Sequence, residues 1–280
     1  MSPLGQVQNV SDNSVAAQSG RDTNITIQGV SVSEVKLLVD AFVQSHLPAL
    51  RAAARDAAEQ NAQRFLQCFV SELSKSQTAS AQEFTKPDAQ NSFNDAVRGC
   101  ALKGDDADID LVAQMLVERL SSTDKPVLKL VSEAAIRALP VITREHIALL
   151  TLLHFGRYVK LNSVTTVAQL NAFFAHVLPL VRPAFSVSDA SKRYLESVGV
   201  LSVNEVADAN ILPGNMRQHY PFLPAADDDL RKAGGEAILE FSDAHAKMRA
   251  QVLFPTSVGQ LIAVKNLARV LPVDAAVWIN

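Results

Sequence analysis

Polar and apolar residues alternate near the start of the chain, where the spacing is that of a β-strand. The clearest case is 23–28, Thr-Asn-Ile-Thr-Ile-Gln, which predicts a short strand. Two further short runs, 6–11 and 14–19, are separated from each other and from 23–28 by turn-forming residues. Three strands of about six residues do not bury enough surface to be stable alone.

Helical spacing of apolar residues dominates after residue 30. Ser31 and Glu34 form the pattern of a capping box, and Val30 and Val35 occupy the hydrophobic-staple positions around it. Proline, glycine and polar residues then separate a series of predicted helices. The predicted helices are 32–47, 49–74, 88–101, 106–121, 126–138, 144–159, 166–178, 187–197, 228–250 and 257–270.

One of these helices, 144–159, is apolar on nearly every side and is expected to be the central buried helix. Residues 75–87 are interpreted as a polar linker, and 275–279 as a final strand. The pattern thus predicts a mainly α fold: a multi-helix body with a short N-terminal β segment.

The last third of the chain has the order of a winged-helix unit. The segment 194–201 reads as a helix that ends in Gly199 and is followed by an apolar strand, and 253–263 reads as a strand leading into a helix. About fifty residues separate the two halves, which is far more than an ordinary wing contains. A winged-helix-like C-terminal part is one interpretation of this order, and a packing module is the other. The predicted domains are 1–30 as a β-forming oligomerisation segment, 31–185 as a helical domain and 186–280 as the winged-helix-like region.

The amino-acid composition indicates a globular protein of a reducing compartment. Hydrophobic residues make up 48% of the chain and charged residues 20%, which is typical of a globular protein. The two cysteines, Cys68 and Cys100, provide no disulfide framework and suit a reducing compartment. No signal peptide and no apolar run of about 20 residues is recognisable, so we expect a cytoplasmic protein without a membrane span.

Motifs of catalysis, metal binding and cofactor binding are not recognisable, so no catalytic residue, metal or cofactor is predicted. The spacing of Asp106, Asp108 and Asp110 resembles the opening of a calcium loop. Leu111 and Val117, however, stand where that loop needs Gly and Glu, and a helix N-terminus rich in carboxylates is the preferred interpretation. The six histidines are dispersed and are interpreted as structural. A hydrolase or nuclease with a site assembled from dispersed residues is kept as an alternative.

The N-terminal strands suggest self-association, because strands from several subunits can satisfy one another's backbone edges. A loose polar tail is the alternative. The predicted helix 49–74 carries one polar residue, Asn61, within its apolar stripe. A single buried Asn can set the register of two associating helices. Ordinary packing of this helix inside one subunit is the other interpretation. The candidate association residues are Val7, Val10, Val15, Ala17, Ile25, Ile27 and Asn61. The expected partners are further copies of this chain and an unknown protein that the helical body recognises.

Basic residues near the winged-helix-like part provide a candidate nucleic-acid surface, because cationic side chains contact phosphates. These residues are Lys192, Arg193, Lys265 and Arg269. The formal net charge is −3, which lacks the basic excess of proteins that coat DNA. A packing module without nucleic acid is therefore preferred.

Several short motifs resemble an uncharacterised bacterial family known mainly by locus-style names. They are the N-terminal Ser11-Asp12-Asn13-Ser14 with Gln18 and Gly20-Arg21-Asp22, the 29–35 segment GVSVSEV, the 256–263 segment TSVGQLIA, and the closing Val277-Trp278-Ile279. The chain departs from the family pattern at Ala17-Gln18, where Ile-Gln is usual, and at Arg21, which splits the turn.

The resemblance implies no catalytic residue. Related N-terminal segments precede varied bacterial domains, some linked with phage defence, so the resemblance implies a portable assembly element. The leading hypothesis is a homo-oligomeric bacterial cytoplasmic scaffold or sensor. A DNA-binding winged-helix-like regulator is the first alternative.

Overall fold

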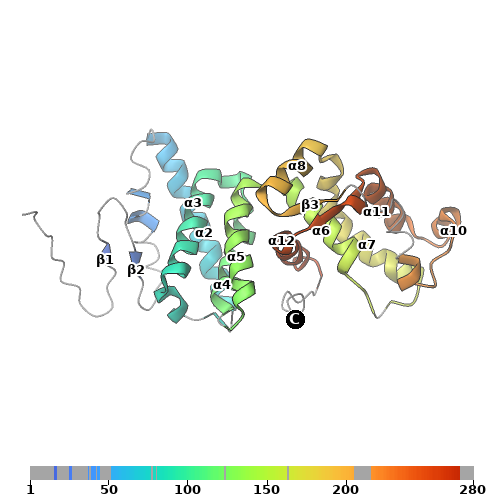
Figure 1. The fold of residues 1–280 in the computed structure, drawn as a ribbon, viewed down its shortest axis with the longest axis horizontal. Coiled ribbons are helices and arrows are strands. Elements are labelled where there is room, and N and C mark those ends of the chain that lie inside the picture. The colour runs from blue at the N-terminus through green and yellow to red at the C-terminus, as the bar shows by residue number, and fades with distance from the viewer. Residues whose placement is uncertain are drawn as a thin grey trace, which may run out of the picture. The chain divides into compact units, whose positions relative to one another are not determined.

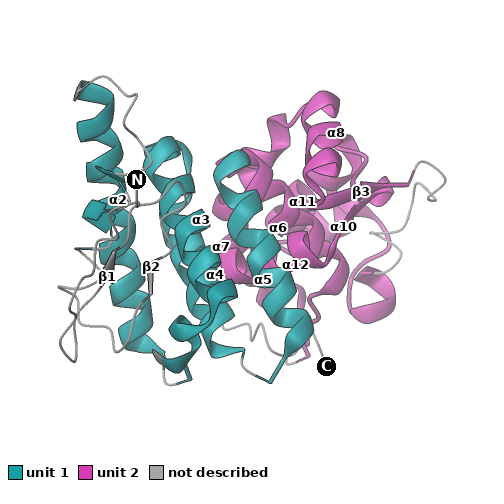
Figure 2. Ribbon diagram, turned by 60° about the vertical axis from the view of Figure 1, so that its left-hand side comes forward, with its two compact units in different colours: residues 1–141 teal, residues 142–280 magenta. Residues whose placement is uncertain are grey.

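The computed structural model describes residues 16–17, 25–26, 37, 39–41, 43–44, 52–76, 78–79, 81–122, 124–162, 164–204 and 216–271. The fold is mainly α (Figure 1), as the sequence predicts. The chain forms two compact units, Met1–Val141 and Ile142–Asn280, coloured teal and magenta in Figure 2. This division differs from the boundary that we placed after residue 185, because the helices between 144 and 181 pack with helices near the C-terminus.

The first unit begins with an antiparallel pair of two-residue strands, β1 (Ala16–Ala17) and β2 (Ile25–Thr26). Ala16 lies opposite Thr26, and Ala17 lies opposite Ile25. The pair falls inside the predicted runs 14–19 and 23–28. The run 6–11 and the capping box at 31–34 lie outside the described residues. The described residues between 37 and 44 are helical, as predicted for 32–47.

Four longer helices form the body of the first unit and lie side by side (Figures 1 and 2). Helix α2 packs on α3 and α4, and α4 packs on α5. The elements are α2 (Ala52–Lys75), η1 (Ala81–Thr85), α3 (Pro87–Lys103), η2 (Gly104–Asp106), α4 (Ile109–Ser121), α5 (Pro126–Ala138) and η3 (Leu139–Val141), where η marks a 3₁₀ turn.

Four phenylalanine rings form the core between α2, η1 and α3. Phe69 lies 5.8 Å from Phe84 and 5.9 Å from Phe93, measured between ring centroids, and Phe65 stacks on Phe69 at 6.1 Å. Edge-to-face pairs of this kind add to the hydrophobic stabilisation. The polar linker predicted at 75–87 is therefore wrong in part, because η1 buries Phe84 in this core.

The second unit is built around α6, in which all ten residues from His146 to Phe155 are buried. The prediction of a central helix at 144–159 is confirmed. Helix α6 packs against α12, α7 and η4, and α7 packs against α11. The elements are α6 (Arg144–Tyr158), α7 (Val167–Val181), η4 (Arg182–Ser186), α8 (Asp189–Val198), β3 (Leu201–Val203), α10 (Asp227–Lys232), α11 (Glu236–Lys247), η5 (Ala250–Val252), β4 (Leu253–Pro255) and α12 (Ser257–Leu267).

The helix predicted at 228–250 is two helices, α10 and α11. The break falls at Gly234, whose φ of 79° lies in the left-handed region that only glycine adopts readily. The new N-terminus of α11 receives a cap from another helix: the Oδ1 atom of Asn171 in α7 accepts hydrogen bonds from the backbone N–H of Ala237 (2.8 Å) and Ile238 (3.3 Å). The cap supplies acceptors that the first turn of a helix lacks.

Strands β3 and β4 pair antiparallel, with Leu201 opposite Pro255 and Val203 opposite Leu253. This pair confirms the strands predicted after Gly199 and before residue 256. The final strand predicted at 275–279 lies outside the described residues.

Among the described residues, no single helix combines the length and the apolar composition needed to cross a membrane, although the bent pair Val167–Ser186 and Asp189–Val198 meets both criteria when taken together.

Candidate functional site: an ion cluster around a buried arginine and a cationic cavity

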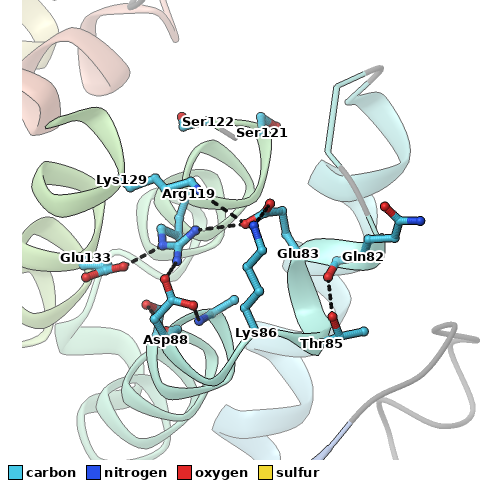
Figure 3. Close-up of polar contacts among 12 residues, drawn as sticks. Gln82, Glu83, Thr85, Lys86, Asp88, Arg119, Ser121, Ser122, Lys129 and Glu133 are labelled. Atoms are coloured by element: carbon cyan, nitrogen blue, oxygen red, sulfur yellow. Dashed lines mark hydrogen bonds and ion pairs between the residues drawn. The ribbon is translucent and has the colours of Figure 1, made fainter. Parts of the chain in front are cut away.

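The first unit contains a fully buried arginine. Arg119 lies in the last turn of α4, and its side chain is 0% exposed. Its Nε atom donates to Oε1 of Glu133 in α5 at 2.6 Å, and its Nη2 atom donates to Oδ2 of Asp88 in α3 (Figure 3). A guanidinium buried in this way is tolerated because carboxylates surround it.

Glu83 of η1 completes the group. Its side chain is 3% exposed and accepts hydrogen bonds from Nζ of Lys86 (2.5 Å) and Nζ of Lys129 (3.1 Å). The Nη1 atom of Arg119 lies 3.6 Å from Oε2 of Glu83, an ion-pair distance. Burial alone raises the pKa of Glu83, but the two lysine hydrogen bonds outweigh burial and lower the pKa to about 2.

We call these six residues, Glu83, Lys86, Asp88, Arg119, Lys129 and Glu133, the ion cluster. Three cations face three carboxylates, so the formal charges cancel. The cluster joins η1, α3, α4 and α5 through charge-assisted hydrogen bonds (Figure 3). Its geometry fixes the positions of four segments, and the low pKa of Glu83 keeps that carboxylate ionised rather than ready to donate a proton.

The ion cluster was not predicted from the sequence. One signal was present: Arg119 falls on the buried face of α4, three and four residues after the buried Leu116 and Met115. A charge at such a position predicts a buried partner. Nothing in the spacing, however, identified Glu83 or Glu133 as that partner.

In the second unit, two of the predicted nucleic-acid residues lie together. Lys192 and Arg193 of α8 line a cavity of about 160 Å³, which we call the cationic cavity. Lys192 is 9% exposed, and its Nζ atom donates to Oδ1 of Asp189 (2.7 Å) and to the carbonyl of Met248 (3.0 Å). Arg193 pairs with Glu196 at 3.2 Å. The lining residues are Asp189, Lys192, Arg193, Val203, Met248, Arg249, Val252 and Leu253.

The other two predicted nucleic-acid residues do not line this cavity. Lys265 lies in the last turn of α12, and Arg269 follows that helix, where its Nη1 atom donates to Oδ1 of Asn266 at 3.2 Å. The structure instead adds Arg249 to Lys192 and Arg193. The predicted four-residue surface is thus divided between two places.

The candidate association residues are only partly described. Ala17 and Ile25 face each other in register across the β1–β2 pair. Val7, Val10, Val15 and Ile27 lie outside the described residues. Asn61 donates through Nδ2 to the carbonyl of Ala101 at 3.2 Å, so its amide takes part in packing between α2 and α3 of one unit.

The histidine, aspartate and cysteine side chains that could bind a metal or act as a nucleophile serve the packing and capping of helices. His146 accepts at Nδ1 from the Thr143 N–H (3.1 Å) in the cap of α6, and Asp108 caps α4. Burial raises the pKa of Cys68 to about 11 and that of Cys100 to about 12, which keeps both thiols protonated near neutral pH. In the described parts of the chain, no group of three or more His, Cys, Asp or Glu side chains could hold a metal ion.

The fold defines a mainly α protein of two compact units. A protein-family model with the description ":-like" matches residues 29–233, and the chain belongs to the family that this model describes. The match begins after the N-terminal strands and extends through α10. No curated protein and no solved structure matches the chain.

Proposed function

We propose that the protein is a homo-oligomeric bacterial cytoplasmic scaffold or sensor whose copies associate through residues 1–30. The observation that carries the proposal is the β1–β2 pair, in which each strand is only two residues long. A two-stranded ribbon is marginal in water. Its outer edges offer backbone N–H and C=O groups that strands from other copies can pair. Association would therefore stabilise the strand pair.

The helical body supplies the surface for a partner protein in this proposal. Val127 and Leu130 lie one helical turn apart on α5 and are 57% and 66% exposed. Exposed apolar side chains that lie close together are typical of interaction surfaces. The link with phage defence rests on the resemblance of the N-terminal motifs.

The proposal is tested by removing residues 1–28 and measuring the molar mass by light scattering after size exclusion. We expect the full chain to be an oligomer and the shortened chain to be smaller by a whole-number factor. A proline cannot donate to a strand ladder, so Ile25→Pro in the full chain should lower the mass too, whereas Ile25→Val should leave it unchanged. An identical mass for the full and the shortened chain would overturn the proposal.

A DNA-binding regulator is the second candidate. It is favoured by the antiparallel β3–β4 pair, which follows α8 and precedes α12 as the wing of a winged-helix protein does. Here α10, α11 and η5 are inserted between the two strands. A gel-shift assay with duplex DNA at several salt concentrations tests this function, because phosphate contacts weaken steeply with salt. Absence of a shift at low salt would remove this candidate.

A further inference from the structure

The backbone of Arg249 has an unusual conformation. Helix α11 ends at Lys247, Met248 is its C-cap, and Arg249 follows with φ 54° and ψ 41°. This is the position after a helix C-cap where glycine is strongly favoured, because a side chain in the left-handed region costs about 1–2 kcal/mol. Among the described residues other than glycine, Arg249 is the one with a positive φ. The chain thus has a long cationic side chain at a position where the backbone conformation favours glycine.

Arg249 belongs to the lining of the cationic cavity, together with Lys192 and Arg193. Its charge also acts on Asp189 in the same lining, where it helps to lower the pKa of that carboxyl after the larger effect of Lys192. Asp189 is the one acidic residue in that lining, so cations outnumber carboxylates by three to one. The volume of about 160 Å³ is more than ten times the roughly 10–15 Å³ that a single water molecule requires. The cavity therefore combines positive charge with space for a small molecule.

The hydrogen-bond donors in the cavity are not all in use. The ammonium of Lys192 has three N–H groups, two of which are bound by Asp189 and the Met248 carbonyl. For the third N–H, and for the guanidinium of Arg249, the described residues provide no hydrogen-bond partner. Because the two existing bonds hold Lys192 in place within a buried setting, little side-chain entropy would be lost when an anion binds there.

We propose that the cationic cavity binds a small phosphate-bearing ligand, with Lys192 and Arg249 as the contacting residues and Arg193 beside them. The planar guanidinium and the neighbouring ammonium match the charge and the oxygen geometry of a phosphate dianion. A nucleic-acid backbone fits less well, because Lys265 and Arg269 lie outside the cavity and the whole chain is acidic.

The left-handed conformation of Arg249 supports the same conclusion. Residues held in unfavourable backbone conformations cluster at binding sites, where the strain is retained because the side chain is needed. A glycine at this position would relieve the strain, and a gain of stability accompanied by a loss of function is a common result of such a change. This site does not depend on association through residues 1–30.

The test uses the full chain, with inorganic phosphate as the probe and chloride at equal ionic strength as the reference. We expect phosphate to raise the melting temperature and to bind with a measurable heat in calorimetry. Arg249→Gly should weaken phosphate binding at least tenfold, while its melting temperature without phosphate stays equal to that of the wild type or rises. Lys192→Gln should weaken binding as well. Arg231→Ala, which removes an exposed arginine of α10, should leave binding unchanged.

Two results would overturn the inference. One is equal phosphate binding by Arg249→Gly and the wild type, and the other is no response of the wild type to phosphate beyond that to chloride. A short DNA duplex is the third arm of the test. If the duplex bound more tightly than phosphate and lost affinity in Arg249→Gly, the cavity would be part of a nucleic-acid surface and the small-ligand assignment would be wrong.

Discussion

Gly259 in the first turn of α12 lies directly against the backbone carbonyl of Val200, so that an added Cβ atom would be 2.0 Å from the carbonyl oxygen. The same oxygen accepts a hydrogen bond from the Thr256 N–H at 3.1 Å, and the Thr256 hydroxyl donates to the Gly199 carbonyl at 2.7 Å. Thr256 also caps α12 by accepting from the Gly259 N–H at 3.3 Å. The Thr-Ser-Val-Gly motif is therefore explained by close packing of α12 on the start of the β3–β4 pair.

Replacing Gly259 by alanine should destabilise the second unit by about 3 kcal/mol, at the upper end of the cost of overpacking, because the new methyl group meets backbone and not a movable side chain. Gly199→Ala is the matched control. Gly199 has a φ of 82° and open space around it, so only the conformational cost of about 1 kcal/mol applies. Urea unfolding measures both. Equal effects of the two substitutions would contradict the close contact.

Arg119→Met should destabilise the first unit by about 3–5 kcal/mol, because it removes the central cation from the buried Glu83 and the partly exposed Glu133. Arg64→Met removes an exposed arginine that pairs with Asp105 and should change stability little. The comparison is made by urea unfolding at neutral pH. A double variant, Arg119→Met with Glu133→Gln, should recover part of the loss. If Arg119→Met were as mild as Arg64→Met, the cluster would not hold its four segments together.

Two buried histidines should make the second unit sensitive to acid. Burial lowers the pKa of His154 and of His245 to about 4, and the charge of Arg157 lowers that of His245 further. The unfolded chain takes up these protons near pH 6.5 and the folded chain only near pH 4. Stability is therefore full above pH 6.5 and falls as the pH drops towards 4, by about 2 kcal/mol per histidine at pH 5.

Unfolding midpoints at pH 7.5 and pH 5 measure this loss. His154→Gln should reduce the difference between the two midpoints, whereas His176→Gln, at an exposed position of α7, serves as the control substitution. A wild-type chain that is equally stable at both pH values would show that these histidines are not kept neutral by burial.

The helices were predictable where the chain carries strong boundary residues. The predicted helix 126–138 coincides with α5, because Pro126 suits the first helical position. The prediction of one helix at 228–250 failed because two glycines interrupt the pattern, and only the structure shows that Gly234 takes a left-handed conformation. The 3₁₀ turn η1 was not predicted within the linker at 75–87, because a single buried residue, Phe84, produces no periodic pattern of apolar residues.

The candidate sites were less predictable, since they depend on contacts between distant segments. Lys192 and Arg193 were recognised as cations near a strand, but the Met248 carbonyl that holds Lys192 is 56 residues away in sequence. The positive φ of Arg249 could not be predicted, because arginine, unlike glycine, does not indicate a left-handed backbone conformation. The ion cluster likewise joins Arg119 to Asp88, 31 residues earlier, and no local pattern specifies that pairing.

The hydrogen bond between the Asn266 amide and the Thr151 hydroxyl, 2.9 Å long, joins side chains 115 residues apart in sequence. It lies between α12 and α6, which pack together at the centre of the second unit. During synthesis, α6 leaves the ribosome long before the helix that covers it. Domains generally fold from the N-terminus as they emerge, so the first unit can fold while α6 still exposes Leu150, which lies beside Gly259 of α12 in the folded chain. Nascent chains that stall before Ser257 are thus the form of this protein most in need of a chaperone.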